Sequence, residues 1–267
     1  MQFETARKLV SEQLDTLSTA LASGQSEQLQ NYLAAMARFH RYSVSNVFLI
    51  LLQNPDATHV AGYHTWRSLG RHVKEGEKGI AIIAPMRFAN KDEADGQTPK
   101  DQEARIRFRT AYVFDVSQTD GEPLPDIGQA HGDPGSFSER LRGLVKQMSI
   151  ELEFADDLGG ALGVSKGGKI AIKNDLSPAQ EFSVLVHELA HEILHHKKSV
   201  ERPSKTLRET QAEAVAYIVA QGIGLDTGDA STNYIQLYQG DAKTLMDSLE
   251  EVRQAATEIL SALLADE

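Results

Sequence analysis

Residues 182–191 read FSVLVHELAH and contain an H-E-x-x-H motif inside an apolar segment. On a helix, His187 and His191 lie four residues apart on one face, so both imidazoles can reach one metal ion. Glu188 then lies beside them, where its carboxylate can act on a water molecule at the metal. The stretch predicts a helical zinc hydrolase site with Glu188 as its catalytic base.

The flanking residues define where this helix begins. Ser177 is a favourable N-cap, Pro178 suits the first helical position, and Gln180 completes a capping box. Downstream, apolar residues recur at helical spacing and predict a buried face: Phe182, Leu185, Val186, Leu189, Ala190, Ile193 and Leu194. A buried, rigid helix is what a preorganised metal site requires.

A third metal ligand is expected downstream, because catalytic zinc usually takes three protein ligands. Glu209 and Glu213 lie one helical turn apart in the segment 207–217. We expect Glu209 to bind Zn²⁺ and Glu213 to accept the free ring N–H of a ligand histidine, an order that resembles the thermolysin-like gluzincins. The reverse order of the two glutamates stays open.

His195 and His196 complicate the ligand count, because His187, His191 and His195 share one helical stripe. At 1.5 Å per residue these three histidines span about 12 Å, which is too far for one tetrahedral ion. The sequence therefore leaves His195 either as a group that supports a ligand or as a cation that offsets the helix dipole.

Composition limits the class of protein. The chain has 267 residues, of which 41% are hydrophobic and 24% charged, so it can bury a core. It contains no cysteine, and any zinc site must use histidine and carboxylate. The amino terminus lacks an apolar signal segment, and the apolar stretch 47–52 is too short to cross a bilayer. We expect a cytoplasmic protein without a membrane partner.

The net charge of −11 argues against a globally basic nucleic-acid binder, but the charge distribution differs locally. Between residues 38 and 80, Lys and Arg outnumber Asp and Glu and alternate with aromatic residues, a composition typical of surfaces that bind single-stranded nucleic acid. The expected ligand face comprises Arg38, Arg41, Trp66, Arg67, Arg71, Lys74 and Lys78.

The order of expected elements divides the chain in two. Before a Gly- and Pro-rich linker at 116–137, we expect helices at 3–22, 25–38, 44–53 and 65–69, strands at 80–84 and 107–114, and a polar loop at 90–104. After it, we expect a helix at 138–148, a strand at 169–172 that forms a peptide-docking edge, the metal helix, the glutamate-bearing helix and a carboxy-terminal helix from 241. The expected domains are residues 1–125 and 138–267.

Four short motifs carry a family resemblance: YSVSN at 42–46, WRSLG at 66–70, VKEGEKG at 73–79 and VFDVSQT at 113–119. In this order they resemble the amino-terminal domain of the ArdC plasmid antirestriction family. The segments 187–191 and 209–224 resemble that family's second domain and, more distantly, the ImmA/IrrE metallopeptidases. The insertion at 90–104 departs from the pattern.

The resemblance implies an α+β protein: an N-terminal mixed α/β domain that binds single-stranded DNA, then a mainly helical, gluzincin-like metallopeptidase domain with a small sheet. Its substrate would be an unidentified protein, and Tyr217 or Tyr234 could stabilise the oxyanion. Two alternatives stay open: a non-catalytic DNA-protecting protein with a structural zinc site, and a regulatory protease that cleaves a repressor.

Overall fold

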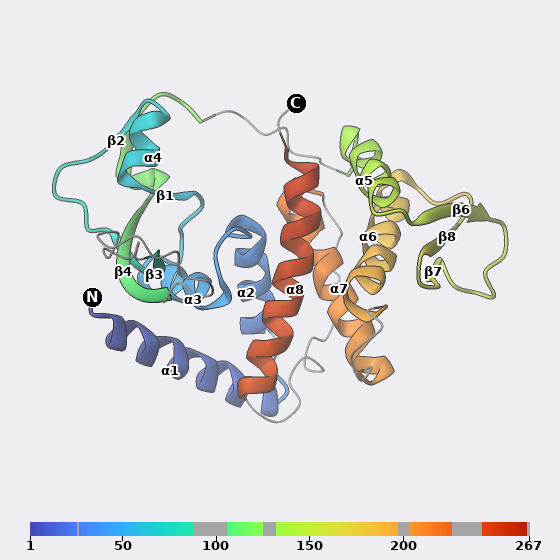
Figure 1. Ribbon diagram of the computed structural model, residues 1–267, viewed down its shortest axis with the longest axis horizontal. Coiled ribbons are helices and arrows are strands. Elements are labelled where there is room, and N and C mark those ends of the chain that lie inside the picture. Colours follow the sequence, from blue (N-terminus) through green and yellow to red (C-terminus); the bar gives the residue numbers. More distant parts are fainter. Residues whose placement is uncertain (26, 88–105, 125–131, 197–202, 226–241, 266–267) are drawn as a thin grey trace, which may run out of the picture. The chain divides into compact units, whose positions relative to one another are not determined.

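The computed structural model describes residues 1–25, 27–87, 106–124, 132–196, 203–225 and 242–265 (Figure 1). The chain forms two compact units, and neither is continuous in sequence. Unit 1 comprises residues 1–13 and 48–124, and unit 2 comprises residues 14–47 and 125–267.

Unit 1 is built around a three-stranded antiparallel sheet of order β1-β4-β3. The sheet consists of β1 (Val60–Gly62), β3 (Ile80–Arg87) and β4 (Ile106–Asp115), and a separate pair is formed by β2 (Arg71–Val73) and β5 (Thr119–Gly121). The short helix α4 (Tyr63–Ser68) places Trp66 in the core, where its indole N–H donates to the carbonyl of Phe114 at 2.9 Å. Trp66 thus joins α4 to β4 in the core of unit 1.

The VFDVSQT motif ties the loops of unit 1 together. Asp115, only 2% exposed, accepts hydrogen bonds from the N–H groups of Thr58 and His59 and from both donors of Ser117. It also caps the 3-10 turn η1 (Val116–Gln118) in a reciprocal capping box with Gln118. Asp115 of the motif therefore supplies the acceptors that these backbone N–H groups need.

Unit 2 is mainly helical and carries a small mixed sheet. The three-stranded sheet has the order β6-β8-β7, with β6 parallel and β7 antiparallel to β8. The elements of unit 2 are α2 (Glu27–Arg38), α5 (Ser136–Gln147), β6 (Glu151–Ala155), β7 (Gly163–Ser165), β8 (Lys169–Lys173), α6 (Pro178–His195), α7 (Lys205–Ile223) and α8 (Ala242–Leu263). Helix α7 packs against α2, α6 and α8, so it lies at the centre of the helical part.

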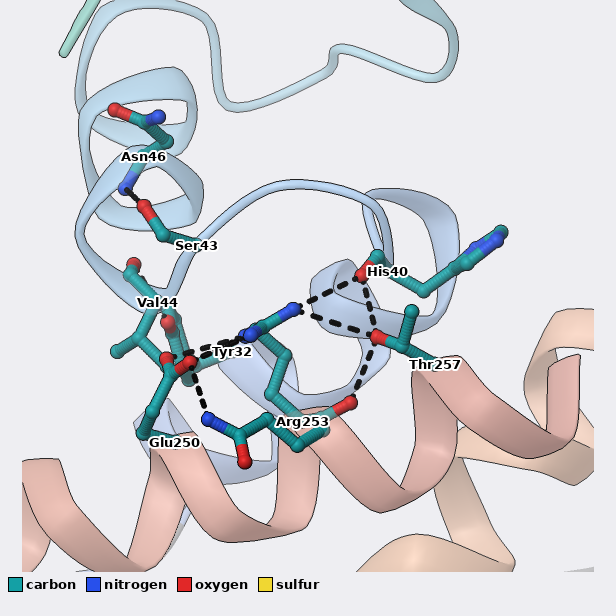
Figure 2. Close-up of polar contacts among 9 residues, drawn as sticks. Tyr32, His40, Ser43, Val44, Asn46, Glu250, Arg253 and Thr257 are labelled. Carbon is teal, nitrogen blue, oxygen red and sulfur yellow. Dashed lines mark hydrogen bonds and ion pairs between the residues drawn. The ribbon is translucent and has the colours of Figure 1, made fainter. Parts of the chain in front are cut away.

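Helix α8 also holds the segment that follows α2 (Figure 2). The hydroxyl of Thr257 donates to the carbonyl of His40 at 2.6 Å, and Arg253 forms an ion pair with Glu250 at 2.5 Å. The hydroxyl of Tyr32 donates to the carbonyl of Val44 at 2.8 Å. These contacts order the backbone that leads into α3 (Val44–Gln53).

The helices expected from sequence at 3–22 (α1, Phe3–Ala22), 44–53 and from 178 are confirmed, as is the mixed α+β class. Helix α8 carries an apolar stripe at helical spacing that forms a packed face, because its members are buried: Leu245, Leu249, Val252, Ala256, Ile259 and Leu263. Residues 116–121, expected in the linker, form η1 and β5 instead. The loop at 90–104 lies outside the described residues.

The expected docking edge differs from the structure. The strand at 169–172 is β8, which lies at the centre of its sheet, so β7 and not β8 is the outer strand nearest α6. The grouping of residues 14–47 with unit 2 follows from the packing of α2 on α7, a contact between segments far apart in sequence. Within the described residues, no helix has the length and apolar character needed to cross a membrane.

Candidate metal centre

The phase of α6 is set at its amino terminus. The hydroxyl of Ser177 accepts the N–H of Gln180 at 3.3 Å, and the Gln180 amide oxygen accepts the N–H of Ser177 at 3.2 Å, so the expected capping box is present. The apolar face of α6 is buried, and His191 and Glu188 are buried with it. Helix α6 therefore holds Glu188 and His191 on a rigid support.

Helix α7 brings a carboxylate to the two histidines. The Nε2 atoms of His187 and His191 are 3.2 Å apart, and Oε2 of Glu209 lies 3.6 Å from each. Two nitrogens bound to one tetrahedral zinc at about 2.0–2.1 Å lie roughly 3.3 Å from each other. One ligand atom from each of the three side chains lies within 4.8 Å of the others, so this donor set fits a divalent metal.

The outward-facing ring nitrogens of the two histidines have different partners. Nδ1 of His187 lies 3.3 Å from Oε2 of Glu213, one turn beyond Glu209 on α7. Nδ1 of His191 lies 2.9 Å from Nδ1 of His195. In both rings, the hydrogen-bonded Nδ1 leaves Nε2 for the shared centre.

Glu188 and His187 line a cleft of about 480 Å³. The cleft is bounded by α6, α7 and the start of β7, and is lined by Leu162, Gly163, Ala179, Gln180, Ser183, Val184, His187, Glu188, Glu213, Ala216 and Tyr217. The backbone N–H of Ser165 donates to the Glu188 carboxylate. A Cβ atom at Gly163 would lie 2.6 Å from Val184 and 2.7 Å from Cγ of Glu188, so only glycine allows this approach.

Burial and neighbouring charges shift the titration of these groups. Burial raises the pKa of Glu188, and the charge of Glu209 raises this pKa further. Burial and the adjacent His187 lower the pKa of His191 to about 4. For His187, the carboxylates of Glu213 and Glu188 outweigh burial and raise the pKa. The site therefore combines one basic imidazole with a carboxylate that accepts a proton more readily than usual.

The structure assigns Glu192 of α6 a role that the sequence analysis did not predict. Its carboxylate accepts the Ser165 hydroxyl at 2.6 Å and the N–H groups of Gly167 and Gly168 at 2.9 and 2.7 Å. Both glycines have positive φ, which turns their N–H groups toward the carboxylate. Glu192 thus fastens the β7–β8 turn to α6, and the Gly-Gly pair was the signal in the sequence.

The structure brings most of the predicted hydrolase residues together. Tyr217 lines the cleft, one helical turn after Glu213, and Tyr234 lies outside the described residues. His195 is 5% exposed and contacts His191, so it does not serve as a solvated cation at the end of the helix.

The structure agrees less well with the expected DNA-binding face than with the expected hydrolase site. Trp66 is 2% exposed and hydrogen-bonded in the core, so the expectation that it stacks on a base is wrong. The guanidinium of Arg71 donates to Thr119 and to the carbonyls of Gly121 and Glu122, which assigns it to the β2–β5 pair. Lys74 donates to the carbonyl of Ser117 at 2.9 Å.

Four of the expected cations remain exposed: Arg38, Arg41, Arg67 and Lys78. Arg38 and Arg41 belong to unit 2, and Arg67 and Lys78 belong to unit 1. Phe108 and Tyr112 of β4 are about half exposed and were missed; they lie four residues apart on one face of the strand, and Arg107 and Arg109 flank Phe108.

Comparison with known proteins places both halves of the chain. Residues 5–114 match the N-terminal domain of the anti-restriction factor ArdC, and residues 146–220 match the IrrE N-terminal-like domain of the M78 peptidases. The metal-free crystal structure of the antirestriction ArdC protein from the R388 plasmid shares the fold, with a TM-score of 0.56 and 16% identity over 96% of this chain and 97% of that one. The chain is ArdC-like.

This ArdC-like chain also matches the Mn(II)-bound structure of the R388 protein, with a TM-score of 0.55 over 97% of this chain and 99% of that one. An uncharacterized Bacillus anthracis protein, pXO2-81, is 26% identical over 272 residues, which cover 85% of this chain. The ArdC-like chain spans about half the length of that relative, 46%.

Proposed function

We propose that this ArdC-like chain joins a single-stranded-DNA-binding domain to a zinc-dependent peptidase, and that it acts in antirestriction. The observation that carries the peptidase half is the convergence of His187, His191 and Glu209 into one cluster, with His187 and Glu188 lining the adjoining cleft. The match to the M78 domain and the metal-bound form of the R388 relative support the same assignment.

His187, His191 and Glu209 would hold the metal, because two imidazoles and one carboxylate form a donor set that suits zinc. The R388 relative has a Mn(II)-bound structure, which supports the binding of a divalent ion by this chain. When bound, zinc supplies a Lewis acid that polarises the scissile carbonyl and lowers the pKa of a water molecule. Glu213, 3.3 Å from Nδ1 of His187, would keep that ring in the tautomer that frees Nε2.

Glu188 would act as the general base and acid. Its carboxylate would take a proton from the attacking water and return it to the leaving amine. Tyr217 lines the same cleft and is our candidate for stabilising the oxyanion. The outer strand β7 would pair with an extended substrate polypeptide and direct it along α6.

Metal content and cleavage together test this half of the proposal. Purified wild type should retain about one zinc, and His187→Ala and Glu209→Ala should lose it, whereas Glu213→Ala should weaken binding without abolishing it, by roughly 10–100-fold. An equal loss of zinc in Glu209→Ala and Glu213→Ala would overturn the assignment of Glu209 as ligand and Glu213 as supporting residue.

Glu188→Gln separates a peptidase from a DNA-protecting protein with a structural metal. The variant should keep its metal and fold but lose cleavage and biological protection against restriction. Full protection by Glu188→Gln would favour the non-catalytic alternative. Cleavage of a co-encoded repressor by wild type would favour the regulatory protease.

The DNA-binding half of the proposal rests on the match of residues 5–114 to the ArdC domain and on the exposed residues of unit 1. The Phe108 ring stacks on that of Phe3, with centroids 6.2 Å apart, and the Tyr112 hydroxyl accepts a hydrogen bond from the amino terminus at 2.6 Å. We propose that bases stack on the exposed remainder of these two rings, with Arg67 and Lys78 contacting phosphates. Fluorescence anisotropy with a labelled single-stranded oligonucleotide tests this face. Phe108→Ala should weaken binding by about 1–3 kcal/mol per stacked base lost.

Charge substitutions provide the control. Arg67→Gln and Lys78→Gln should reduce both affinity and its dependence on salt concentration. Arg71→Gln, matched in charge, should mainly reduce the stability of unit 1, because its guanidinium is held by backbone carbonyls. Arg38→Gln and Arg41→Gln, in unit 2, are tested as a separate pair. An unchanged salt slope in every variant would refute the choice of cations.

A further inference from the structure

A chain of hydrogen bonds leads away from the metal centre through three helices; His191, His195 and Gln211 are buried, and the last member, Glu251, is exposed. Nδ1 of His191 lies 2.9 Å from Nδ1 of His195, both on α6. Nε2 of His195 lies 3.0 Å from Oε1 of Gln211 on α7. Nε2 of Gln211 lies 2.8 Å from Oε2 of Glu251 on α8. His195 and Gln211 are 5% and 1% exposed, so water does not substitute for these partners.

The direction of every hydrogen bond in this chain follows from its last member. An ionised carboxylate only accepts, so Glu251 requires the amide nitrogen of Gln211 as donor. The amide oxygen of Gln211 then faces His195 and can only accept, which requires a proton on Nε2 of His195. A neutral imidazole has one N–H, so Nδ1 of His195 accepts and Nδ1 of His191 must donate.

The consequence reaches the metal centre. With its proton on Nδ1, His191 presents a lone pair on Nε2, the atom that lies 3.6 Å from Glu209 and 3.2 Å from Nε2 of His187. The opposite tautomer would place an N–H at the centre and prevent coordination. His187 is oriented directly by Glu213, whereas the orientation of His191 depends on three further side chains.

We propose that Glu251, Gln211 and His195 form a directional hydrogen-bond relay that fixes His191 as the Nδ1–H tautomer and positions it as a metal ligand. They are positioning residues, and through Glu251 the helix α8 supports the metal centre without supplying a ligand. The proposal rests on the proposed metal function, but the tautomer of His191 can be measured without metal.

The first test is the tautomeric state of the metal-free protein. Long-range ¹H–¹⁵N spectra of histidine-labelled protein at alkaline pH distinguish protonated from unprotonated ring nitrogens. Wild type should show the Nδ1–H form of His191 and the Nε2–H form of His195. A proton on Nε2 of His191 would overturn the relay whether or not the protein binds metal.

The second test compares two ways of changing Gln211. Gln211→Met removes the acceptor of His195 and should give mixed tautomers of His191. The exchanged pair Gln211→Glu with Glu251→Gln retains an acceptor toward His195 and a donor toward residue 211, so it should restore the single tautomer. A group that merely fills a buried polar site would not show this directional rescue.

Zinc affinity, measured by competition with a chromophoric chelator, links the relay to function. Gln211→Met should bind zinc about 10-fold more weakly, and the exchanged pair should return to within about threefold of wild type. Thr210→Val is the matched control, because Thr210 is buried beside Gln211 and its hydroxyl donates to the carbonyl of Thr206 in the same helix at 2.9 Å. Wild-type affinity and a fixed His191 tautomer in Gln211→Met would overturn the relay.

If wild type binds no zinc, the proposed function fails, and the spectra of the metal-free protein still decide the relay.

Discussion

Asp115→Asn tests whether the VFDVSQT motif stabilises unit 1 through a single buried carboxylate. Oδ1 of Asp115 accepts from Thr58 and His59 at 2.8 and 3.1 Å, and Oδ2 accepts from the N–H and hydroxyl of Ser117 at 2.9 and 2.6 Å. Asparagine replaces one of these oxygens with an NH₂ group. Whichever way the amide turns, that group faces two donors.

The cost can be worked out from these contacts. The Ser117 hydroxyl can rotate to accept, so the less costly orientation directs the NH₂ group toward Ser117 and loses the bond from the Ser117 N–H. A hydrogen bond to a charged group contributes about 1.5–3 kcal/mol, so we expect Asp115→Asn to reduce the free energy of unfolding by about 2–3 kcal/mol. Asp115→Ala, which leaves all four donors without this partner, should cost about 4 kcal/mol or more.

Urea denaturation followed by tryptophan fluorescence is the assay. Trp66 is the only tryptophan of the chain, it is buried in unit 1, and its indole N–H bonds the residue before Asp115. Asp120→Asn is the matched control, because the Asp120 side chain is 63% exposed and lies 3.8 Å from Lys74. We expect it to remain within about 0.5 kcal/mol of wild type. An equally small effect of Asp115→Asn would refute the reasoning.

The effect should depend on pH with a definite sign. Burial opposes ionisation of Asp115, but hydrogen bonds from Ser117, Thr58 and His59 lower its pKa below the ordinary 3.8. A lowered folded-state pKa adds stability that is fully present above the unfolded-state pKa and is lost as the pH falls through the folded value. The difference between wild type and Asp115→Asn should therefore be largest near pH 7 and shrink below about pH 4.

Three further predictions concern unit 2. Gly163→Ala forces a Cβ to within 2.7 Å of Cγ of Glu188, so thermal unfolding should show a loss of about 1–3 kcal/mol in the free energy of unfolding. The proposed peptidase activity should also fall, with metal content unchanged. Wild-type stability and activity would contradict this prediction. Glu192→Gln should destabilise the protein by roughly 2–3 kcal/mol at pH 7 and by less below pH 4, because hydrogen bonds lower the Glu192 pKa despite burial. A stability difference between wild type and Glu192→Gln that stays constant with pH would contradict this prediction. Zinc at 100 times its Kd should raise the free energy of unfolding by about 2.7 kcal/mol, measured by circular dichroism and reversed by a chelator, whereas His187→Ala should show no such shift.

Local sequence was sufficient for the long helices and for the phase of the H-E-x-x-H motif. The capping box at Ser177 and Gln180 and the apolar period of 3.6 act within one or two turns, so the pairing of His187 with His191 follows from residues 177–195 alone. The short strand β7 could not be found in this way. Its three residues form a strand only because β8 pairs with them.

Composition could not separate a ligand face from a core. Trp66, Arg67 and Arg71 occur together among basic residues, yet the structure buries Trp66, exposes Arg67 and bonds Arg71 to backbone carbonyls. The difference lies in whether the neighbouring strands offer acceptors and apolar surface. Those neighbours, β4 and β5, come from residues about 50 positions later in the chain.

The sequence by itself determined that a helix would carry two histidines and a glutamate on adjacent faces, because helical hydrogen bonds join residues four positions apart. Only the tertiary structure decided which groups meet them: Glu209 at Nε2 of both rings, Glu213 at Nδ1 of His187, and His195 with Gln211 behind His191. These contacts depend on the packing of α6 against α7 and of α7 against α8. Side-chain packing between distant segments sets that register, and no local pattern encodes it.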